Sequence, residues 1–301
     1  MTHAAGVTVI VPTFEAWPIA HRTLAAVAAD CRASGRPWEV LAVDNESGPG
    51  FRRAARGFAA AHPGVRFVFR TGLGGRNFQP GAARNIGIEQ ARHPCLVFLD
   101  ADCVPSTGLI PAYAAAVARS HHTVFLGHRV FVDPAGLAAA DVAADRRLLD
   151  RLPPVRSTSN YGLDVERRLP ELHALAAHDR PYDLMYASDM AMHRSCLGDE
   201  RFEAVFDGRW GYEDIELGYR LHRLGRSFAY LPDAHVYHQE GGSLSPDERA
   251  RGRRRNFAIA EEMIDGFGPY RHGNARAGAH PERDTGAAGP GRRSAAGRGG
   301  G

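Results

Sequence analysis

The sequence of 301 residues contains no lysine, so all 37 of its basic residues are arginine. This absence excludes reactions that depend on a lysine side chain. A P-loop places a lysine on the nucleotide phosphates, and pyridoxal-phosphate enzymes and Schiff-base aldolases need a lysine amine. Protein-kinase chemistry is disfavoured for the same reason. The arginine bias itself indicates a GC-rich genome rather than selection at one site.

Cysteines are few, and long apolar runs are missing. The four cysteines are scattered and form no CxxC pair, which argues against a zinc ribbon and favours a reducing compartment. No uninterrupted apolar segment reaches the roughly 20 residues that span a bilayer. The N-terminus has no basic region ahead of its short apolar run, so it predicts a strand rather than a signal peptide. We therefore expect a cytoplasmic protein without a membrane span; peripheral membrane association stays open.

The positive charge is concentrated in the last 31 residues. The whole chain carries a net charge of +3, but residues 271–301 hold six arginines against Glu282 and Asp284, a local net of +4. The remaining 270 residues are therefore near −1, and we expect no nucleic-acid partner for them. Residues 271–301 are rich in glycine, alanine and arginine, a composition that predicts disorder.

Short apolar runs alternate with alanine-rich stretches through the first hundred residues. Such continuous apolar strands, separated by helices, are typical of a parallel sheet that is covered on both faces. The predicted strands are Val7–Val11, Val40–Val43, Val65–Phe69 and Leu96–Leu99, and the predicted helices are Ala20–Cys31, Arg52–Ala61 and Ala82–Gln90.

The second half of the chain is less regular. Residues 152–183 mix proline, serine, asparagine and charges, so we expect a long, partly ordered insertion there. Elsewhere the patterns predict helices at Ala112–Ala118 and at Ile215–Leu224, the latter ending at Gly225. They also predict one long strand or a strand pair at Thr123–Val132, a strand at Met185–Met192, and short strands at Phe228–Leu231 and His235–His238.

Two carboxylates follow the fourth predicted strand, in the segment FLDADCVP. Because side chains alternate along a strand, Asp100 and Asp102 would share a face if the strand continued through them. Two neighbouring carboxylates repel each other unless a cation or a donor lies between them. The triplet alone fits a polar turn equally well. However, ligands of parallel sheets bind where strands end, and Pro12-Thr13 and Asp44-Asn45 follow other strands in the same way, which favours a cation site.

Further polar residues occur late in the chain. The segment WGYEDIELGYRL places Trp210, Glu213 and Asp214 just ahead of a predicted helix. Carboxylates in this position are either partners of the helix dipole or, in a pocket walled by the tryptophan, a general base. The segment HVYHQE supplies His235 and His238, which could complete a metal shell, although either one alone is typical of an ordinary strand residue.

Together these segments resemble the family 2 glycosyltransferases, inverting enzymes with a GT-A fold that use nucleotide-activated sugars. The Trp-Gly-x-Glu-Asp segment is also similar to the acceptor-side motif of animal galactosyl- and N-acetylgalactosaminyltransferases. The resemblance implies an α/β fold with a mostly parallel central sheet flanked by helices. One domain would cover residues 1–270, with a nucleotide-binding half of about residues 1–105 and an acceptor half of residues 106–270. The matching segments, from Val7 to Gln239, are VTVIVPTFEA, LAVDNES, GAARNIGI, FLDADCVP, WGYEDIELGYRLHRLG and HVYHQ.

The resemblance implies a set of donor-binding residues. Asp44 would accept a hydrogen bond from the imide of uracil or thymine; many relatives have a second aspartate where this chain has Asn45, which leaves the base open. Arg84 would approach the phosphates, with an exposed helix charge as the alternative. Asp189 would touch the donor sugar or, equally, face solvent. The full implied set is Pro12, Thr13, Glu15, Asp44, Asn45, Arg84, Asn85, Asp100, Ala101 and Asp189.

The resemblance also implies a metal site and a catalytic base. Asp102, with Asp100, would hold a divalent cation that bridges the donor phosphates; in the family the second aspartate is usually the direct ligand. Oxygen ligands suit Mg²⁺ or Mn²⁺, and an imidazole from His238 favours Mn²⁺. Asp214 would be the general base, and Glu213 would bind acceptor or sugar hydroxyls. Trp210 and Gly211 would line the acceptor side.

The implied activity is metal-dependent, inverting transfer from a UDP-sugar, or a dTDP-sugar, to an unknown hydroxyl acceptor. A sugar-nucleotide pyrophosphorylase usually opens with a glycine-rich loop that carries arginine and lysine, whereas this chain has VPTFEAWP and no lysine. An inactive nucleotide-sugar-binding module would have no physical reason to keep Asp100, Asp102, Asp214 and His238 together. A lipid-linked sugar, a small natural product and a peptide all remain open as acceptors.

Overall fold

The computed structural model describes residues 5–75, 78–157, 160, 162–240 and 246–268. The segment 271–301, for which we expect disorder, lies outside these residues. The chain divides into one compact unit of residues 1–265 and a second unit of residues 266–301. Every helix and strand named below belongs to the first unit.

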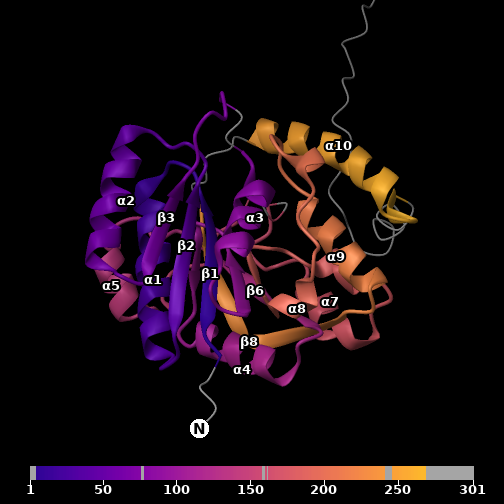
Figure 1. Cartoon of the computed structure of the whole chain (residues 1–301), viewed down its shortest axis with the longest axis horizontal. Coiled ribbons are helices and arrows are strands. Elements are labelled where there is room, and N and C mark those ends of the chain that lie inside the picture. Colours follow the sequence, from indigo (N-terminus) through magenta and orange to yellow (C-terminus); the bar gives the residue numbers. More distant parts are fainter. Residues whose placement is uncertain (1–4, 76–77, 158–159, 161, 241–245, 269–301) are drawn as a thin grey trace, which may run out of the picture. The chain divides into compact units, whose positions relative to one another are not determined.

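An eight-stranded sheet forms the centre of the first unit (Figure 1), in the order β3-β2-β1-β4-β7-β6-β8-β5. The first four strands in this order are mutually parallel. β7 is antiparallel to β4 and β6, β8 is parallel to β6, and β5 is antiparallel to β8. The expected α/β sheet, with a parallel nucleotide-side half, is confirmed. The strands are β1 Val7–Thr13, β2 Trp38–Asp44, β3 Val65–Phe69, β4 Cys95–Leu99, β5 Cys103–Pro105, β6 Thr123–Val132, β7 Asp189–His193 and β8 Ser227–Gln239.

Ten α-helices accompany these strands in the described residues. Each of the first three has a proline in its first turn. Backbone N–H groups at this position have no partner within the helix, so a proline costs no hydrogen bond there, and its fixed φ suits the helix. None of the helices in the described part of the chain combines the length and the apolar character that crossing a bilayer requires. The helices are α1 Trp17–Ala33, α2 Pro49–Ala61, α3 Pro80–Gln90, α4 Leu109–Arg119, α5 Ala139–Ala144, α6 Arg147–Asp150, α7 Leu169–His173, α8 Arg194–Leu197, α9 Glu213–Arg223 and α10 Pro246–Met263.

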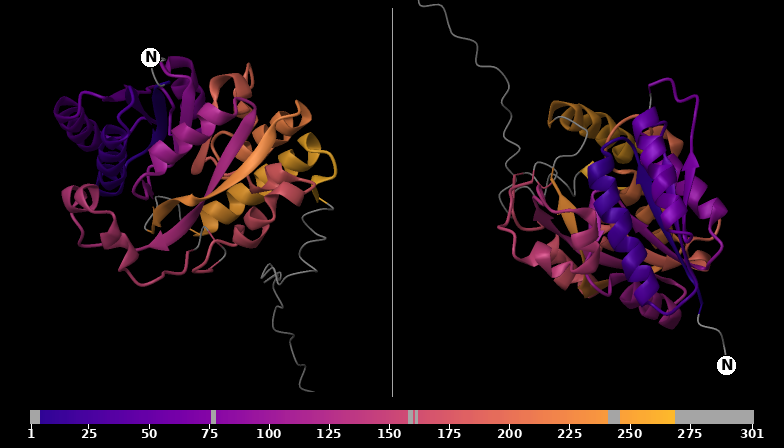
Figure 2. Two further views of the ribbon diagram at one scale, coloured as in Figure 1. Left: turned by 90° about the horizontal axis from the view of Figure 1, so that it is seen from below. Right: turned by 90° about the vertical axis from the view of Figure 1, so that its left-hand side faces the viewer.

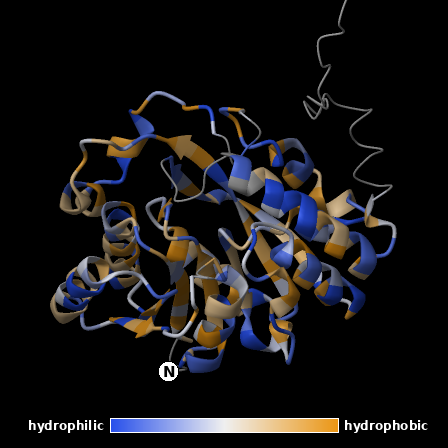
Figure 3. Ribbon diagram, turned by 90° about the horizontal axis from the view of Figure 1, so that it is seen from above, coloured by the Kyte–Doolittle hydropathy of each residue, from blue (hydrophilic) through white to orange (hydrophobic). Residues whose placement is uncertain are grey.

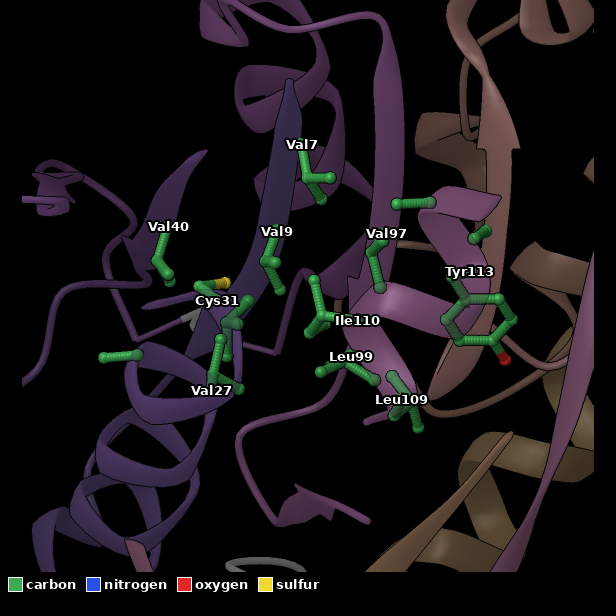
Figure 4. Close-up of a cluster of buried hydrophobic side chains, with 14 of the residues drawn as sticks. Val7, Val9, Val27, Cys31, Val40, Val97, Leu99, Leu109, Ile110 and Tyr113 are labelled. Atoms are coloured by element: carbon green, nitrogen blue, oxygen red, sulfur yellow. The ribbon is translucent and has the colours of Figure 1, made fainter. Parts of the chain in front are cut away.

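Alternation along the strands divides the apolar core into two layers. Val9 of β1 belongs to a cluster with Val27 of α1 and Ile110 of α4 (Figure 4). The next residue, Ile10, belongs to a second cluster with Ile88 of α3, to which α9 also contributes. The strands are apolar on both faces, whereas the helices mix apolar and polar residues (Figure 3). Helices therefore cover both faces of the sheet.

The structure corrects several predicted elements in the second half. Thr123–Val132 is one long strand, which lies beside β8 (Figure 2). The strand predicted at Met185–Met192 is wrong in its first part, because β7 begins only at Asp189, after a 3₁₀ helix at Pro181–Leu184. The two short strands predicted near the end are one strand, β8. The elements that were not predicted are β5, α5, α6, α7, α8 and α10.

Parallel pairing brings three strand ends to one edge of the sheet. Thr13 of β1 is in register with Asp44 of β2, and β4 runs parallel to β1 on its other side. The loops that follow β1, β2 and β4 therefore lie along one edge, where parallel sheets bind their ligands.

Candidate active site

The segment Asp100–Asp102 is a turn and not a continuation of β4. The strand ends at Leu99, and the N–H of Cys103 donates to the Asp100 carbonyl oxygen at 3.0 Å. The two carboxylates therefore do not share a strand face, as we had expected if the strand continued. Asp100 pairs with Arg84, and Asp102 lies beside His238. The two carboxylates of this turn therefore have different partners and lie in separate places.

Arg84 of α3 joins the turn after β4 to the start of α9. Its Nη2 donates to Oδ1 of Asp100 at 2.7 Å, and its Nη1 to Oε1 of Glu213 at 3.1 Å. The guanidinium lies over the Phe202 ring, and only 3% of the side chain is exposed. Burial lowers the pKa of Arg84, but the neighbouring carboxylates raise it above its usual range. The alternative of an exposed helix charge is wrong; the phosphate contact stays a prediction.

Glu213 and Asp214 form the first turn of α9 instead of preceding the helix. Oδ2 of Asp214 accepts from the Ala187 N–H at 3.1 Å, and Oδ1 from the Ile215 N–H at 2.9 Å. Burial, and then the charge of Asp214, raise the pKa of Glu213 to about 7; burial likewise raises the pKa of Asp214. Asp100, Arg84, Glu213 and Asp214 are therefore connected, and we call them the carboxylate cluster.

A second group lies where β5 pairs with β8. Cys103 is in register with His238, and ligand atoms of Asp102, Cys103 and His238 lie within 4.8 Å of one another. Nε2 of His238 is 3.5 Å from Oδ2 of Asp102, while its buried Nδ1 makes no hydrogen bond to any of the described residues. Burial raises the pKa of the Cys103 thiol well above its usual range, and sulfur ligands suit softer metals than Mg²⁺ or Mn²⁺. The carboxylate and the imidazole are donors that fit Mn²⁺.

Glu240 lies close to this group and was not predicted. Its Oε1 is 3.4 Å from Nδ1 of His238, directly after the end of β8. The other predicted histidine, His235, does not join the group. Its ring lies near those of His128 and Tyr237 instead.

The loops after β1 and β2 are tied together by Asp44 and Ser47. Both oxygens of Asp44 accept from Ser47, one from the backbone N–H at 3.0 Å and one from the hydroxyl. The Ser47 hydroxyl oxygen in turn accepts from the Glu15 N–H at 2.7 Å. Asp44 has no exposed surface, and burial raises its pKa. Its contact with a nucleotide base stays a prediction, and one that requires this loop to open.

Two further predicted donor residues hold protein segments together. The Asn45 side chain accepts from Nη1 of Arg70 at 2.7 Å and donates to the Gln79 carbonyl at 3.2 Å. The Asn85 side chain exchanges two hydrogen bonds of 2.9 Å with the backbone of Phe202. The Asn45 amide therefore joins two loops, and the Asn85 amide joins α3 to the segment around Phe202.

The remaining predicted donor residues differ in accessibility. Glu15 is exposed, and Pro12 and Ala101 are half-buried. Thr13 is buried, and within the described part of the chain its hydroxyl has no hydrogen-bond partner. Asp189 is fully buried and accepts from the Tyr113 hydroxyl at 2.6 Å, so the alternative of a solvent-facing aspartate is wrong. Burial raises the pKa of Asp189 to about 8.

A buried ion network supports the segment that contacts Asp214. Glu166 accepts from Nε of Arg129 at 2.8 Å and from Nη2 of Arg168 at 3.0 Å. Nη1 of Arg168 donates to the Leu184 carbonyl at 2.6 Å, and its guanidinium stacks 3.9 Å from the centre of the Tyr186 ring. The network thus fixes the residues before Ala187, the backbone partner of Asp214. No periodic pattern in the sequence predicts this network, because both Glu166 and Arg168 lie in the expected insertion.

The acceptor-side residues lie against α10. Trp210 is half-buried, with the guanidinium of Arg253 5.2 Å from its ring centre. Gly211 has a φ of 101° and Tyr212 a φ of 76°. α10 was not predicted; its buried positions Gly252, Asn256 and Ala260 are four residues apart, but none is a large apolar residue of the kind that signals a helix.

Comparison with known proteins shows which proteins the chain resembles. Residues 8–144 match the sequence profile of Glycosyl transferase family 2. The chain is 26% identical over 269 residues to the hyaluronan synthase of Pasteurella multocida, which covers 86% of this chain and 27% of that protein. It is 28% identical over 239 residues to a validoxylamine A glucosyltransferase of Streptomyces hygroscopicus subsp. limoneus, covering 74% of this chain and 49% of that protein.

Solved structures share the fold. A crystal structure of GalNAc-T7 with UDP, GalNAc and Mn²⁺ superimposes with a TM-score of 0.55 at 16% identity, covering 95% of this chain and 53% of the other. A structure of residues 1–349 of S. aureus TarS gives a TM-score of 0.52 at 17% identity, covering 87% and 74%. The chain thus spans 27% of the synthase and about half of the glucosyltransferase, and the likeness to these structures concerns the fold.

Proposed function

Because the chain carries a family 2 glycosyltransferase domain on a GT-A fold, we propose that it transfers a sugar from a nucleoside diphosphate to an acceptor hydroxyl with inversion. The observation that supports this best is the arrangement around Arg84. This residue joins Asp100, at the donor edge of the sheet, to Glu213, beside the predicted base. Donor-side and acceptor-side carboxylates are thereby parts of one connected site.

On the donor side, the diphosphate would lie at the sheet edge formed by the loops after β1, β2 and β4. We favour a UDP-sugar and keep a dTDP-sugar as the alternative. Asp102 and His238 would hold a divalent cation, Mn²⁺ by their donor set, which when bound supplies positive charge to the departing diphosphate. Asp100, which pairs with Arg84, would contact the ribose or the sugar.

On the acceptor side, Asp214 is the better placed of the two carboxylates to accept the proton of the attacking hydroxyl. Two backbone N–H groups stabilise its charged form and fix its orientation, whereas Glu213 is bound by Arg84. General-base assistance of this kind contributes about 10²–10⁴-fold to the rate. Direct displacement on the face opposite the diphosphate inverts the anomeric carbon and needs no covalent enzyme intermediate.

The four cysteines are all buried free thiols, which fits a reducing compartment. We therefore place the reaction in the cytoplasm, with an unidentified hydroxyl acceptor.

The proposal is tested with a panel of nucleotide sugars, with and without Mn²⁺. We expect thermal stabilisation only with metal plus one class of nucleotide, and release of the nucleotide product on incubation. Asp102→Asn should lose the metal-dependent stabilisation. Asp214→Asn should keep it and lose about 10²–10⁴-fold in kcat.

Asp141→Asn is the matched control, because Asp141 is an exposed carboxylate on α5; it should behave as the wild type. Nucleotide binding without turnover of any donor would contradict the enzymatic proposal and favour a binding module. Equal stabilisation by adenine and uracil nucleotides would contradict the role of Asp44.

A further inference from the structure

The residues that carry Trp210 and lead into Asp214 form a loop with an unusual backbone. We call residues 206–212 the acceptor loop. It ends in two successive residues with positive φ, Gly211 at 101° and Tyr212 at 76°. Glycine adopts this conformation freely, but an L-residue such as tyrosine does so only when its surroundings hold it there. Tyr212 directly precedes α9, and Glu213 and Asp214 are in its first turn. The backbone conformation of Tyr212 therefore determines the direction in which α9 starts, and with it the positions of the two carboxylates.

The side chain of Asn256 on α10 holds this backbone. It has no exposed surface, and its Nδ2 donates to three carbonyl oxygens of the loop. These are the carbonyls of Phe206 at 3.2 Å, Arg209 at 3.3 Å and Gly211 at 3.0 Å. One amide can reach three carbonyls only when the loop is curled around it. A buried amide left without these acceptors would be strongly unfavourable, so the contact fixes the loop.

Three neighbours of Asn256 on the same side of α10 contact the end of the loop. A Cβ at Gly252 would lie 2.8 Å from the backbone nitrogen of Trp210, so the helix and the loop are in direct contact there. The Arg253 guanidinium lies over the Trp210 ring. The Phe257 ring packs edge-on against that of Tyr212, with centres 5.7 Å apart. The spacing of residues 252, 253, 256 and 257 is that of one helix face.

We propose that α10 is a positioning element for the acceptor side of the site, and that Asn256 is its central positioning residue. The helix holds the acceptor loop in place, so that the Trp210 ring and the Asp214 carboxylate are both positioned to contact the acceptor. Asn256 touches no reacting atom and acts through the loop backbone. The inference rests on the proposed function only for the roles of Trp210 and Asp214; the clamping of the loop stands on the contacts themselves.

Two variants of the full-length chain test the clamp. Asn256→Asp keeps the shape of the side chain but turns an oxygen toward three carbonyls. Gly252→Ala pushes on the backbone of Trp210 and leaves the amide intact. Gly57→Ala is the matched control, because Gly57 is a helical glycine of α2 with open space around its Cβ position. We expect the two test variants to raise the acceptor KM or lower kcat at least tenfold, while donor KM and metal-dependent nucleotide stabilisation change less than twofold.

Limited trypsin digestion gives a readout that needs no activity. The chain has no lysine, so trypsin cleaves only after arginine, and Arg209 is exposed within the acceptor loop. We expect cleavage after Arg209, followed by mass spectrometry, to be at least fivefold faster in both test variants than in Gly57→Ala. Cleavage after the exposed Arg53 of α2 should stay unchanged.

The outcomes separate the two proposals. Unchanged cleavage at Arg209 in Gly252→Ala, together with wild-type acceptor kinetics, would overturn the positioning role. So would an equal loss of donor and acceptor parameters, which a purely structural role predicts. Faster cleavage at Arg209 in a protein that turns over no donor would support the clamp and reject the proposed function instead.

Discussion

At the scale of single residues, Arg84 shows why the site uses arginine. Its planar guanidinium presents several N–H groups at fixed angles, so one side chain can bind Asp100 and Glu213 at once. A lysine ammonium is a compact point charge on a flexible stem, and it lacks the rigid fork of donors that holds both carboxylates at fixed angles. Because the pair is buried, it is important for stability: without the arginine, the negative charge of a carboxylate in this position would have no compensating positive charge. Arg84 therefore belongs to the architecture of the site whether or not it also reaches a phosphate.

Asp189 gives a pH-dependent prediction. Burial raises its pKa from 3.8 to about 8, so the carboxyl is neutral in the folded protein and releases its proton on unfolding at any pH between these values. The unfolded state then binds fewer protons, so the free energy of unfolding falls as pH rises from about 4 to about 8. This one group contributes a slope of up to about 1.4 kcal/mol per pH unit. Asp189→Asn, which still accepts from Tyr113, should flatten the dependence.

Urea unfolding at several pH values, for the wild type and the variant, measures this effect. The exposed Asp141→Asn serves as control and should keep the wild-type slope. Parallel curves for the wild type and Asp189→Asn would show that Asp189 is ionised in the folded protein, against the prediction.

The hydrogen-bond partners of the polar side chains in the site could not be predicted from the sequence. The positions of Asp100, Asp102 and Asp214 near strand and helix ends followed from local patterns. The partners did not, because they come from far along the chain: Asn85 binds the backbone of Phe202, and Asp189 binds Tyr113. Ser47 is close to Asp44 in sequence, yet its hydroxyl could equally have faced solvent.

At the scale of elements, the three helices of the first hundred residues were predicted, but each predicted start came too late. α1, α2 and α3 each start two to three residues before the predicted start, at a first turn that contains proline. β8 was divided in two because Pro232 and Asp233 interrupt its apolar pattern. β5 is three residues long and exists only through its pairing with β8. Such an element is defined by tertiary contact and leaves no local signal.

The packing of α3 on β1 allows a prediction at this scale. A Cβ at Gly87 of α3 would lie 2.4 Å from Cγ2 of Ile10, so the helix lies against the strand at this point. Gly87→Ala should gain about 1 kcal/mol in helix propensity and lose about 1–3 kcal/mol through overpacking. We expect a net loss of stability, measured as a lower urea midpoint with an unchanged m-value.

Gly57→Ala in α2 provides the comparison, since its Cβ meets nothing within 4 Å. It should raise the urea midpoint by up to about 1 kcal/mol of stability. A stabilised Gly87→Ala would mean that α3 can move away from β1 at little cost.

At the scale of the whole first unit, the two halves that we predict for donor and acceptor share one sheet. β4, whose end carries Asp100, pairs with β7, which follows the segment that binds Asp214. The two apolar clusters lie on opposite faces of the same strands and each includes residues of both halves. The proposed donor and acceptor halves are therefore not separate units of the fold.

This continuity predicts a single cooperative unfolding transition for the first unit. Differential scanning calorimetry should show one endotherm in which the calorimetric and van't Hoff enthalpies agree. Adding metal and nucleotide should move the whole transition upward, because a ligand at 100 times its Kd stabilises the folded state by about 2.7 kcal/mol. Two transitions, of which only one responds to the ligand, would contradict this and show that β4 and β7 separate before the halves unfold.

A Tyr113→Phe variant offers an internal check, because it removes only the hydroxyl that bonds to Asp189. It should lower the midpoint while the transition stays single.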